Sequence, residues 1–499
     1  MARGERHVAV VGGGIAGLSA AALLAERGCQ VTLLEAQAQV GGKARRVPSP
    51  AGPVDAGPTV LTMRSVFDEL FESAGARLDE HVDIAPMDLL ARHAWPDGSQ
   101  LDLFADPEAS RSAVGEFAGA RAAAEFAAFD ARARRLFEAF EVPVMRSARP
   151  TPLGVAGAVA RDALRLLPAM APASTLWRAL GRQFGDARLR QLFARYATYV
   201  GGSPMLSPAI LMLIWRAEAA GVWHVAGGIS ALARAVAKLA VARGAEIRTG
   251  EPVAEIGVAD GRAAAVLPER GPPLTVDGVV FNGDPAALAA GLLGRGVAHA
   301  APALPPAARS LSAWVWSFAG RPAGYDLAHH TVFFGSDYVR EFDDIFRRRR
   351  PPDDPTIYVC AQDRGLGPPP GDGPERLEII LNAPADGERG PPSDEETARC
   401  TMATYGRLAA AGLDLEPPDP AEALTTPDQF AQRFPGTGGA IYGRAPHGMM
   451  ATFRRPMTRT PLRGLYLAGG GAHPGPGVAM SCLSGQLAAA AIMQDLAST

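Results

Sequence analysis

The 499-residue sequence has few cysteines, and it does not gather them. Four are present, Cys29, Cys360, Cys400 and Cys482, far apart and without a CxxC pair or a Cys/His cluster. This spacing argues against a structural zinc site and against a disulfide framework. We therefore expect no bound metal, and buried thiols in a reducing cytoplasm.

A strong charge of either sign is also missing. The chain has 49 Lys and Arg against 52 Asp and Glu, a formal net charge of −3, which gives no reason to expect a nucleic-acid partner. Hydrophobic residues make up 47 % and charged residues 20 %, a composition typical of globular proteins rather than of disordered ones. The length predicts two or three domains.

No long apolar run is free of interruption. Residues 8–25 come nearest, but Gly12, Gly13, Gly14 and Gly17 break the run where a strand should turn into a helix. Elsewhere nothing approaches the roughly 20 apolar residues that span a bilayer, so we expect neither a transmembrane helix nor export. The sequence also lacks a GxSxG nucleophile elbow and a P-loop, which argues against the chemistry that those motifs carry.

What the sequence does contain is a nucleotide-binding signature over residues 7–35, where the order strand, glycine-rich turn, helix, strand is predicted. In its GxGxxG motif, Gly12 permits the tight turn, Gly14 lets the backbone approach a pyrophosphate, and Gly17 allows close helix packing. The helix N-terminus offers free N–H groups to phosphates, and Glu35 can accept hydrogen bonds from ribose hydroxyls. This context predicts dinucleotide binding and a parallel sheet covered by helices.

A second glycine pair helps to choose between FAD and NAD. Gly41-Gly42-Lys43 begins six positions after Glu35, and here the sequence resembles the glutathione-reductase-2 class of flavoproteins. That class includes amine oxidases, protoporphyrinogen oxidases and carotenoid desaturases. Its members carry a Gly-Gly-Arg/Lys segment beside the FAD diphosphate, which plain NAD-dependent dehydrogenases lack. The resemblance implies FAD as the cofactor.

The resemblance narrows over nearly the whole chain. Five segments of the chain resemble segments of bacterial phytoene-desaturase-type carotenoid oxidoreductases. These are residues 55–61, 199–204, 221–228, 282–285 and 467–477. In those enzymes the first of these segments passes under the flavin ring, and the last is the closing FAD motif. Residues 51–61 and 90–99 together look most like the branch that acts on 1-hydroxycarotenoids, the 3,4-desaturases.

The motifs and the resemblance together imply a set of FAD-binding residues drawn from several parts of the chain. The glycine-rich segment 469–471 has no acidic residue where amine oxidases often carry one. Carotenoid desaturases commonly lack it too, so backbone N–H groups must stabilise that part of the cofactor. The set is Gly12, Gly14, Ile15, Ala16, Gly17, Glu35, Ala36, Gly41, Gly42, Lys43, Gly57, Pro58, Thr59, Val60, Val253, Gly469, Gly470, Gly477, Val478, Ala479 and Met480.

The fold class that follows is α/β, with a discontinuous, Rossmann-like FAD-binding domain of the glutathione-reductase-2 type. A substrate domain and an Ala-, Leu- and Arg-rich helical cap are predicted between its pieces. The predicted ranges are 1–85, 221–285 and 455–499 for the FAD-binding domain, 86–106 and 286–454 for the substrate domain, and 107–220 for the cap.

Two stretches of the cap could contact a membrane. Apolar residues alternate with arginines over 153–167 and 177–190, a pattern that suits either a lipid surface or a helix packed on the core. Since a C40 polyene dissolves only in the bilayer, the resemblance favours peripheral contact. We expect a cytoplasmic protein at the inner face of the membrane, which draws a carotenoid substrate from lipid. The electron acceptor is not indicated.

The reaction that the resemblance implies is the introduction of a C-3,4 double bond into an acyclic 1-hydroxycarotenoid, with one hydrogen leaving as a hydride to FAD and one as a proton. Arg195, Tyr196 and Tyr199 are candidates for lining the substrate tunnel or handling that proton. His473 could exchange a proton near the flavin, but a turn histidine that holds the glycine-rich loop beside Pro474 is the favoured interpretation.

Other functions stay open at this stage. A general phytoene or neurosporene desaturase would share the fold and cofactor. A flavin amine oxidase or a protoporphyrinogen-type oxidase would need a compact, polar or aromatic-lined site in place of a tunnel. A non-catalytic prenyl-binding protein on the same fold would hold no flavin.

Overall fold

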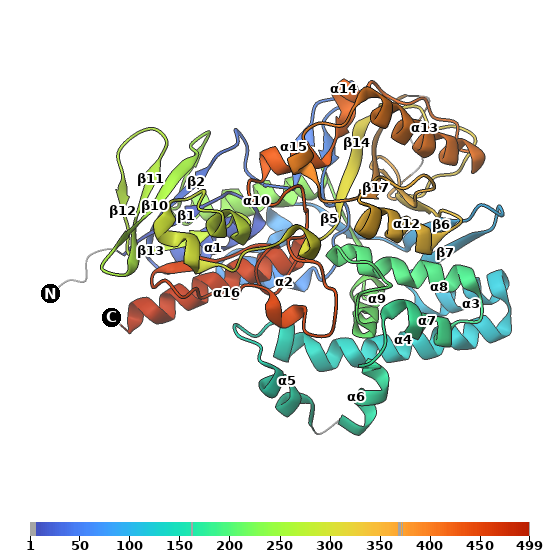
Figure 1. Cartoon of the computed structure of the whole chain (residues 1–499), viewed down its shortest axis with the longest axis horizontal. Coiled ribbons are helices and arrows are strands. Elements are labelled where there is room, and N and C mark those ends of the chain that lie inside the picture. The colour runs from blue at the N-terminus through green and yellow to red at the C-terminus, as the bar shows by residue number, and fades with distance from the viewer. Residues whose placement is uncertain (1–5, 161–162, 368–370, 372, 499) are drawn as a thin grey trace.

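Two sheets of different construction organise the computed structural model, which describes residues 6–160, 163–367, 371 and 373–498. Figure 1 shows the first sheet at the left of the molecule and the second at the upper right. The first has five strands in the order β19-β13-β1-β2-β9, all parallel. Its strands are β1 His7–Val11, β2 Gln30–Glu35, β9 Glu246–Thr249, β13 Gly278–Phe281 and β19 Leu465–Leu467.

Helices cover the parallel sheet, as its apolar strands require. Every residue of α1 (Ile15–Glu26) from Ile15 to Ala25 is buried, because α10 (Ile229–Ala242) and α16 (Val478–Ala497) both pack against it. The apolar run 8–25 is therefore β1 and α1 in the core. A three-stranded sheet lies beside β13 and consists of β10 Val253–Ala259, β11 Arg262–Pro268 and β12 Leu274–Thr275.

The second sheet has seven strands in the order β18-β14-β17-β16-β15-β6-β7, antiparallel except where β15 runs parallel to β6. One face packs its Trp, Ile and Leu side chains under α13 (Asp394–Ala410). The other face approaches β4 (Val54–Ala56). Its strands are β6 Leu89–Ala94, β7 Gln100–Phe104, β14 Ser312–Gly320, β15 His330–Phe333, β16 Ile357–Ala361, β17 Glu375–Ala383 and β18 Leu424–Thr425.

The predicted pieces of the chain can be compared with these sheets. All five parallel strands lie within 1–85, 221–285 and 455–499, and all seven strands of the second sheet lie within 86–106 and 286–454. The domain boundaries themselves remain a prediction. The shorter elements are β3 Arg45–Val47, β5 Ile84–Pro86, β8 Trp223–Val225, α2 Ser65–Ser73, α11 Pro285–Ala289, α12 Tyr338–Asp343, α14 Pro420–Ala423 and α15 Pro427–Arg433.

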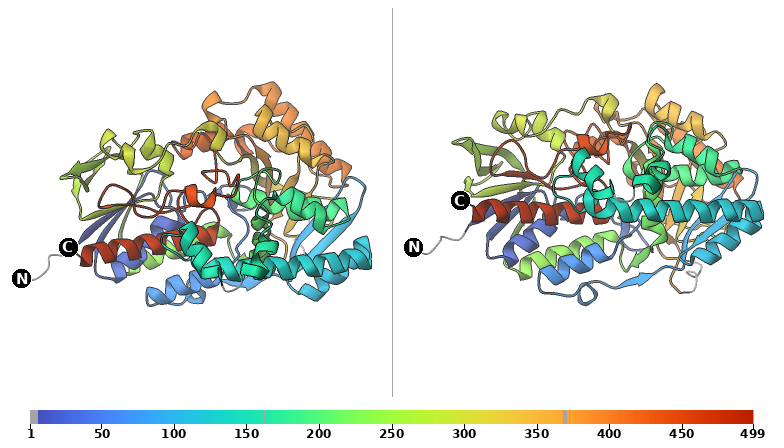
Figure 2. Two further views of the ribbon diagram at one scale, coloured as in Figure 1. Left: turned by 60° about the horizontal axis from the view of Figure 1, so that its bottom comes forward. Right: turned by 90° about the horizontal axis from the view of Figure 1, so that it is seen from below.

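Residues 107–220 are mostly helical, and the long α4 lies at the bottom right in the left view of Figure 2 and runs across the face toward the viewer in the right view. None of the described helices is long and apolar enough to cross a bilayer. The helices are α3 Pro107–Ala118, α4 Ala120–Phe140, α5 Pro152–Val159, α6 Ala163–Met170, α7 Leu176–Gln183, α8 Ala187–Ala194 and α9 Leu213–Ala219, with a 3-10 helix η4 at Arg195–Val200.

The two stretches considered for membrane contact differ in the structure. Leu180 and Leu189 are wholly buried and Phe184 nearly so, because the apolar faces of α7 and α8 pack into the core. Residues 177–190 are therefore not a membrane face. In contrast, α5 and α6 project from the body at the bottom of Figure 1. Residues 161–162 lie outside the described chain.

Candidate active site

One asparagine side chain joins the two glycine-rich motifs. Asn282 follows β13, the strand between β1 and β19. Its Oδ1 accepts a hydrogen bond from the Gly17 N–H (3.0 Å), and its Nδ2 donates to the Ala468 carbonyl (3.0 Å). A Cβ added at Gly14 would lie 2.8 Å from Oδ1, and one at Gly469 would lie 2.7 Å from Nδ2. Close packing around this amide therefore requires glycine at both motifs.

The residues predicted for the adenosine side of FAD gather around Glu35. Its carboxylate is buried at the end of β2, where Oε2 accepts from the Gly13 N–H (2.6 Å) and Oε1 from the Gln37 N–H (2.8 Å). The Gly41 N–H donates to the Gly13 carbonyl (2.8 Å), which brings the second glycine pair against the first turn. The segment that leads to Val253 runs alongside, because β9 pairs with β2.

Two helices begin in this region without a side-chain cap. Gly14 is the N-cap of α1 and Gly477 the N-cap of α16, and neither helix has a capping side chain. Their first N–H groups and positive dipole ends remain available to an anion. The predicted residues Ile15, Ala16 and 478–480 are the first turns of these two helices.

Two cations, half-buried Lys43 and buried Arg455, lie beside the glycine loops without a carboxylate within 4 Å in the part of the chain that the structure describes. Lys43 Nζ donates to the Ile441 carbonyl (2.8 Å) and lies 5.2 Å from the centre of the Phe434 ring. Burial lowers the pKa of Lys43, and the charge of Asp284 opposes this effect. An unpaired buried cation is costly unless an anion accompanies it, so the site fits the diphosphate of FAD.

The second of these cations is Arg455. It donates to the carbonyls of Tyr442 (3.1 Å), Arg444 (2.8 Å) and Gly470 (3.0 Å), and burial lowers its pKa to about 10. The last contact fixes the predicted C-terminal FAD motif. Sequence reasoning missed Arg455, because nothing in its spacing distinguishes it from the other arginines.

The segment predicted to pass under the flavin ring is bonded to the seven-stranded sheet at every second residue. A Cβ at Gly57 would lie 1.9 Å from the Lys43 carbonyl oxygen, so this segment also lies directly against the diphosphate side. Val60 packs on the core beneath the helical region. The bonded pairs are Asp55 with Gln362 (2.9 and 2.7 Å), Gly57 N–H with Glu378 Oε1 (2.7 Å), and Tyr358 OH with Thr59 Oγ1 (2.7 Å).

Two of the catalytic candidates, Tyr196 and Tyr199, meet at Glu218, and Arg195 joins them through Tyr199. Glu218 was not predicted from the sequence. Tyr196 OH donates to Glu218 Oε1 (2.6 Å) and Tyr199 OH to Oε2 (2.5 Å), while Arg195 Nη2 donates to Tyr199 OH (3.0 Å). Burial raises the pKa of both tyrosines well above the usual range. The cluster is a closed network between η4 and α9, and a catalytic role for its members remains a prediction.

His473 is wholly buried and joins two distant parts of the chain. Its Nε2 lies 2.8 Å from the Ser147 carbonyl, so Nε2 carries the ring proton. Burial lowers the pKa of His473, and its own carbonyl accepts from Ser484 Oγ (2.7 Å). The ring thus ties the C-terminal glycine loop to the helical region, which is the structural role that the sequence favours for it.

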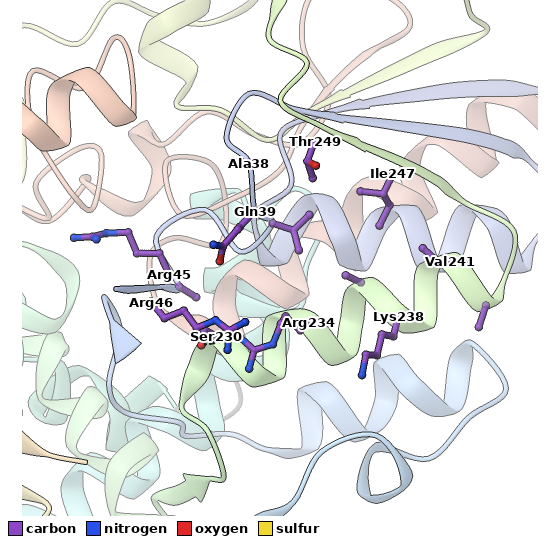
Figure 3. A pocket seen from close by; sticks show the side chains of 14 residues that line it. Ala38, Gln39, Arg45, Arg46, Ser230, Arg234, Lys238, Val241, Ile247 and Thr249 are labelled. Atoms are coloured by element: carbon purple, nitrogen blue, oxygen red, sulfur yellow. Dashed lines mark hydrogen bonds between the residues drawn. The ribbon is translucent and has the colours of Figure 1, made fainter. Parts of the chain in front are cut away.

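An open groove of about 590 Å³ lies between residues 38–46 and α10 (Figure 3). Its floor is mostly apolar, and Figure 3 shows Arg46 and Arg234 together near Ser230, whereas Arg45 points away. None of the predicted FAD-binding residues lines this groove. The groove is therefore separate from the predicted FAD-binding residues.

Glycine turns, uncapped helix ends and two cations gather at one edge of the parallel sheet, an arrangement that fits a dinucleotide diphosphate and the class of flavin-dependent oxidoreductases. The chain belongs to the family of flavin-containing amine oxidoreductases, whose family model matches residues 15–493. This confirms the predicted fold class and FAD as the cofactor, and it removes the non-catalytic alternative.

Individual relatives narrow the resemblance further. The chain is 52 % identical over 491 residues to the hydroxyneurosporene desaturase of Cereibacter sphaeroides, covering 98 % of each chain. It is 49 % identical over 497 residues to that of Rubrivivax gelatinosus, covering 99 % of this chain and 94 % of the relative. Cyclohexylamine oxidase from Brevibacterium oxydans shares the fold, with a TM-score of 0.58 at 18 % identity over 99 % of this chain and 100 % of the other.

Replacing Gly14 with valine should abolish flavin retention. The added side chain would press on Asn282 Oδ1 and occupy the space through which a phosphate approaches the α1 N-terminus. The measurement is the flavin-to-protein absorbance ratio of the purified protein, with circular dichroism to follow the fold. A folded variant that carries full flavin would show that the glycine serves packing alone.

Lys43→Met should weaken FAD binding about 10- to 100-fold, because one charge-assisted hydrogen bond is lost. Lys238→Met, on the exposed face of α10, is the matched control and should bind FAD as the wild type does. Titration of the apoprotein with FAD, followed by flavin fluorescence, measures both. Since burial lowers the pKa of Lys43, wild-type affinity should fall as the pH rises, and this fall should be smaller in Lys43→Met. Equal affinities for the two variants would contradict the assignment of Lys43.

Proposed function

We propose that the chain is a carotenoid desaturase that introduces a C-3,4 double bond into an acyclic 1-hydroxycarotenoid. The observation that carries this proposal is the similarity to hydroxyneurosporene desaturases, at 48–52 % identity over 98–99 % of the chain in three organisms. The next relatives fall to 32 % and below, and they are named for other carotenoid reactions.

The chemistry is the removal of two hydrogens from a single bond that adjoins the polyene. One leaves as a hydride and the other as a proton, and both losses are eased because charge spreads into the conjugated chain. FAD supplies the redox chemistry by accepting the hydride. The protein's own part is to hold the diphosphate through Lys43, Arg455 and the helix ends, and to fix residues 57–60 against the sheet.

The proposed reaction can be tested without knowledge of the electron acceptor. When the anaerobic holoenzyme is mixed with 1-hydroxyneurosporene in liposomes, the visible flavin band should bleach while the polyene absorption shifts to the red. Deuterium at C3 and C4 should slow the bleaching if C–H cleavage limits it. Bleaching without a polyene shift would mean that another bond is oxidised. If neurosporene or phytoene reacted at the same rate, the enzyme would be a general desaturase, and the proposed specificity for a hydroxylated substrate would be wrong.

The proposal includes peripheral contact with the inner face of the membrane, through α5 and α6, to draw the substrate from lipid. Leu153 on α5 is 87 % exposed and Leu167 on α6 is 53 % exposed, and Val142 before them is 65 % exposed. Of the side chains described in α5, only Val155 is buried. An exposed apolar helix at the edge of the molecule supports insertion at the acyl boundary.

Liposome flotation tests this contact. The wild type should float, and Leu153→Asp combined with Leu167→Asp should abolish flotation, because two charges would enter the lipid interface. Met402→Asp is the matched control, since Met402 on α13 is 75 % exposed and should float unchanged. Flotation should survive high salt, which screens charge attraction but not apolar insertion. If the double variant floated as well as the wild type, α5 and α6 would not be the membrane contact.

A further inference from the structure

Two consecutive histidines and a cysteine meet on the face of the seven-stranded sheet that approaches β4. His329 precedes β15, His330 begins it, and Cys360 lies opposite His330 on β16. One ligand atom from each residue lies within 4.8 Å of the other two, and the three residues are 8 %, 3 % and 2 % exposed. We propose that His329, His330 and Cys360 bind a divalent metal ion of the zinc type.

Hydrogen bonding leaves one nitrogen of His329 free for a metal. Nδ1 lies 2.7 Å from the Arg364 carbonyl, which can only accept, so Nδ1 carries the proton and Nε2 carries the lone pair. The Cys360 Sγ lies 3.6 Å from this Nε2. Metal-binding histidines commonly donate the second ring N–H to a carbonyl in this way, which fixes the tautomer and the ring orientation.

A hydrogen bond also orients the His330 ring. Its Nδ1 lies 2.6 Å from Tyr358 OH, and that hydroxyl donates its own proton to Thr59 Oγ1 at 2.7 Å. With Tyr358 donating to Thr59, Nδ1 is the donor to Tyr358 and Nε2 holds the lone pair. Two imidazole nitrogens and one sulfur are a donor set that suits Zn²⁺.

The surroundings provide access and charge compensation. His329 and Cys360 lie in the wall of a cavity of about 320 Å³, which Thr59 and His224 also line. The cavity leaves a fourth coordination position open to water, as in zinc sites with three protein ligands. Binding would displace the thiol proton of Cys360 to solvent and leave one net positive charge. Glu378 lies directly across from Cys360 on β17, and ionisation of its carboxyl on metal binding would offset that charge.

Zinc is not needed for the proposed hydride transfer, but the cluster is linked to the segment predicted to lie under the flavin. Tyr358 joins the His330 ring to Thr59, so an ion bound here would brace residues 57–60 from the side of the sheet. Its presence or absence can therefore be measured apart from desaturase activity.

The test uses the chelator-dialysed holoenzyme and Zn²⁺ alone. The wild type should retain about one zinc per chain after gel filtration, and zinc X-ray absorption should show one sulfur neighbour at ~2.3 Å. Cys360→Ser and His329→Gln should each lose stoichiometric zinc. Cys400→Ser is the matched control, because Cys400 is also buried but lies on α13, and it should bind zinc as the wild type does.

A variant of Tyr358, which contacts the ligand His330, keeps the proposal testable if a ligand variant fails to fold. Tyr358→Phe retains all three ligands and should weaken zinc affinity about 10- to 100-fold, and flavin content reports on the fold. Absence of stoichiometric zinc in the dialysed and reloaded wild type would overturn the proposal. So would zinc binding without a sulfur neighbour, or full zinc binding by a flavin-loaded Cys360→Ser protein. In those cases the cluster is only a hydrogen-bonded pair beside a second histidine.

Discussion

The amide of Asn282 is the contact on which the cofactor site depends. Its oxygen accepts a hydrogen bond from the Gly17 N–H, and its nitrogen donates one to the Ala468 carbonyl. The amide therefore holds together two segments from opposite ends of the sequence. The space that it fills leaves no room for a Cβ at Gly14, Gly17 or Gly469. One side chain thereby joins the first turn of α1 to the segment that leads into the C-terminal glycine loop.

Burial determines how the charged groups around the predicted cofactor site behave. Lys43 and Arg455 are held by carbonyl oxygens and not by carboxylates, so their positive charge is left for the ligand. On the sheet side, the carboxyl of Glu378 is fully buried, and burial raises its pKa well above the usual range. Burial therefore favours the neutral form of Glu378, which accepts a hydrogen bond from the Gly57 N–H.

The helical region shows how one composition can serve two purposes. Residues 153–167 and 177–190 both mix apolar residues with arginine, yet α7 and α8 pack into the core while α5 exposes nearly all of its described side chains. The difference lies in what covers each helix. In the second stretch Phe184 packs against Phe129 of α4, whereas no described element covers Leu153.

The sequence by itself determined the parts of the site that are local. The GxGxxG turn, Glu35 at the end of β2, Gly41-Gly42-Lys43 and the start of α16 were all predictable, because each depends on the backbone within a few residues. The class of cofactor and the alternation of strands and helices in the parallel sheet follow from the same short spacings. The structural role favoured for His473 came from its place in a glycine-rich loop.

Only the tertiary structure decided which distant side chains meet. Asn282 and Gly17 are 265 residues apart, and neither Arg455 nor Glu218 stands out by its spacing. The sequence also shows no Cys/His cluster, yet strand register places Cys360 opposite His330 although 31 residues separate it from His329. Such contacts are set by the order of the strands in the sheet and by their pairing. Both depend on packing across the whole core, and neither can be predicted from the periodicity of the sequence.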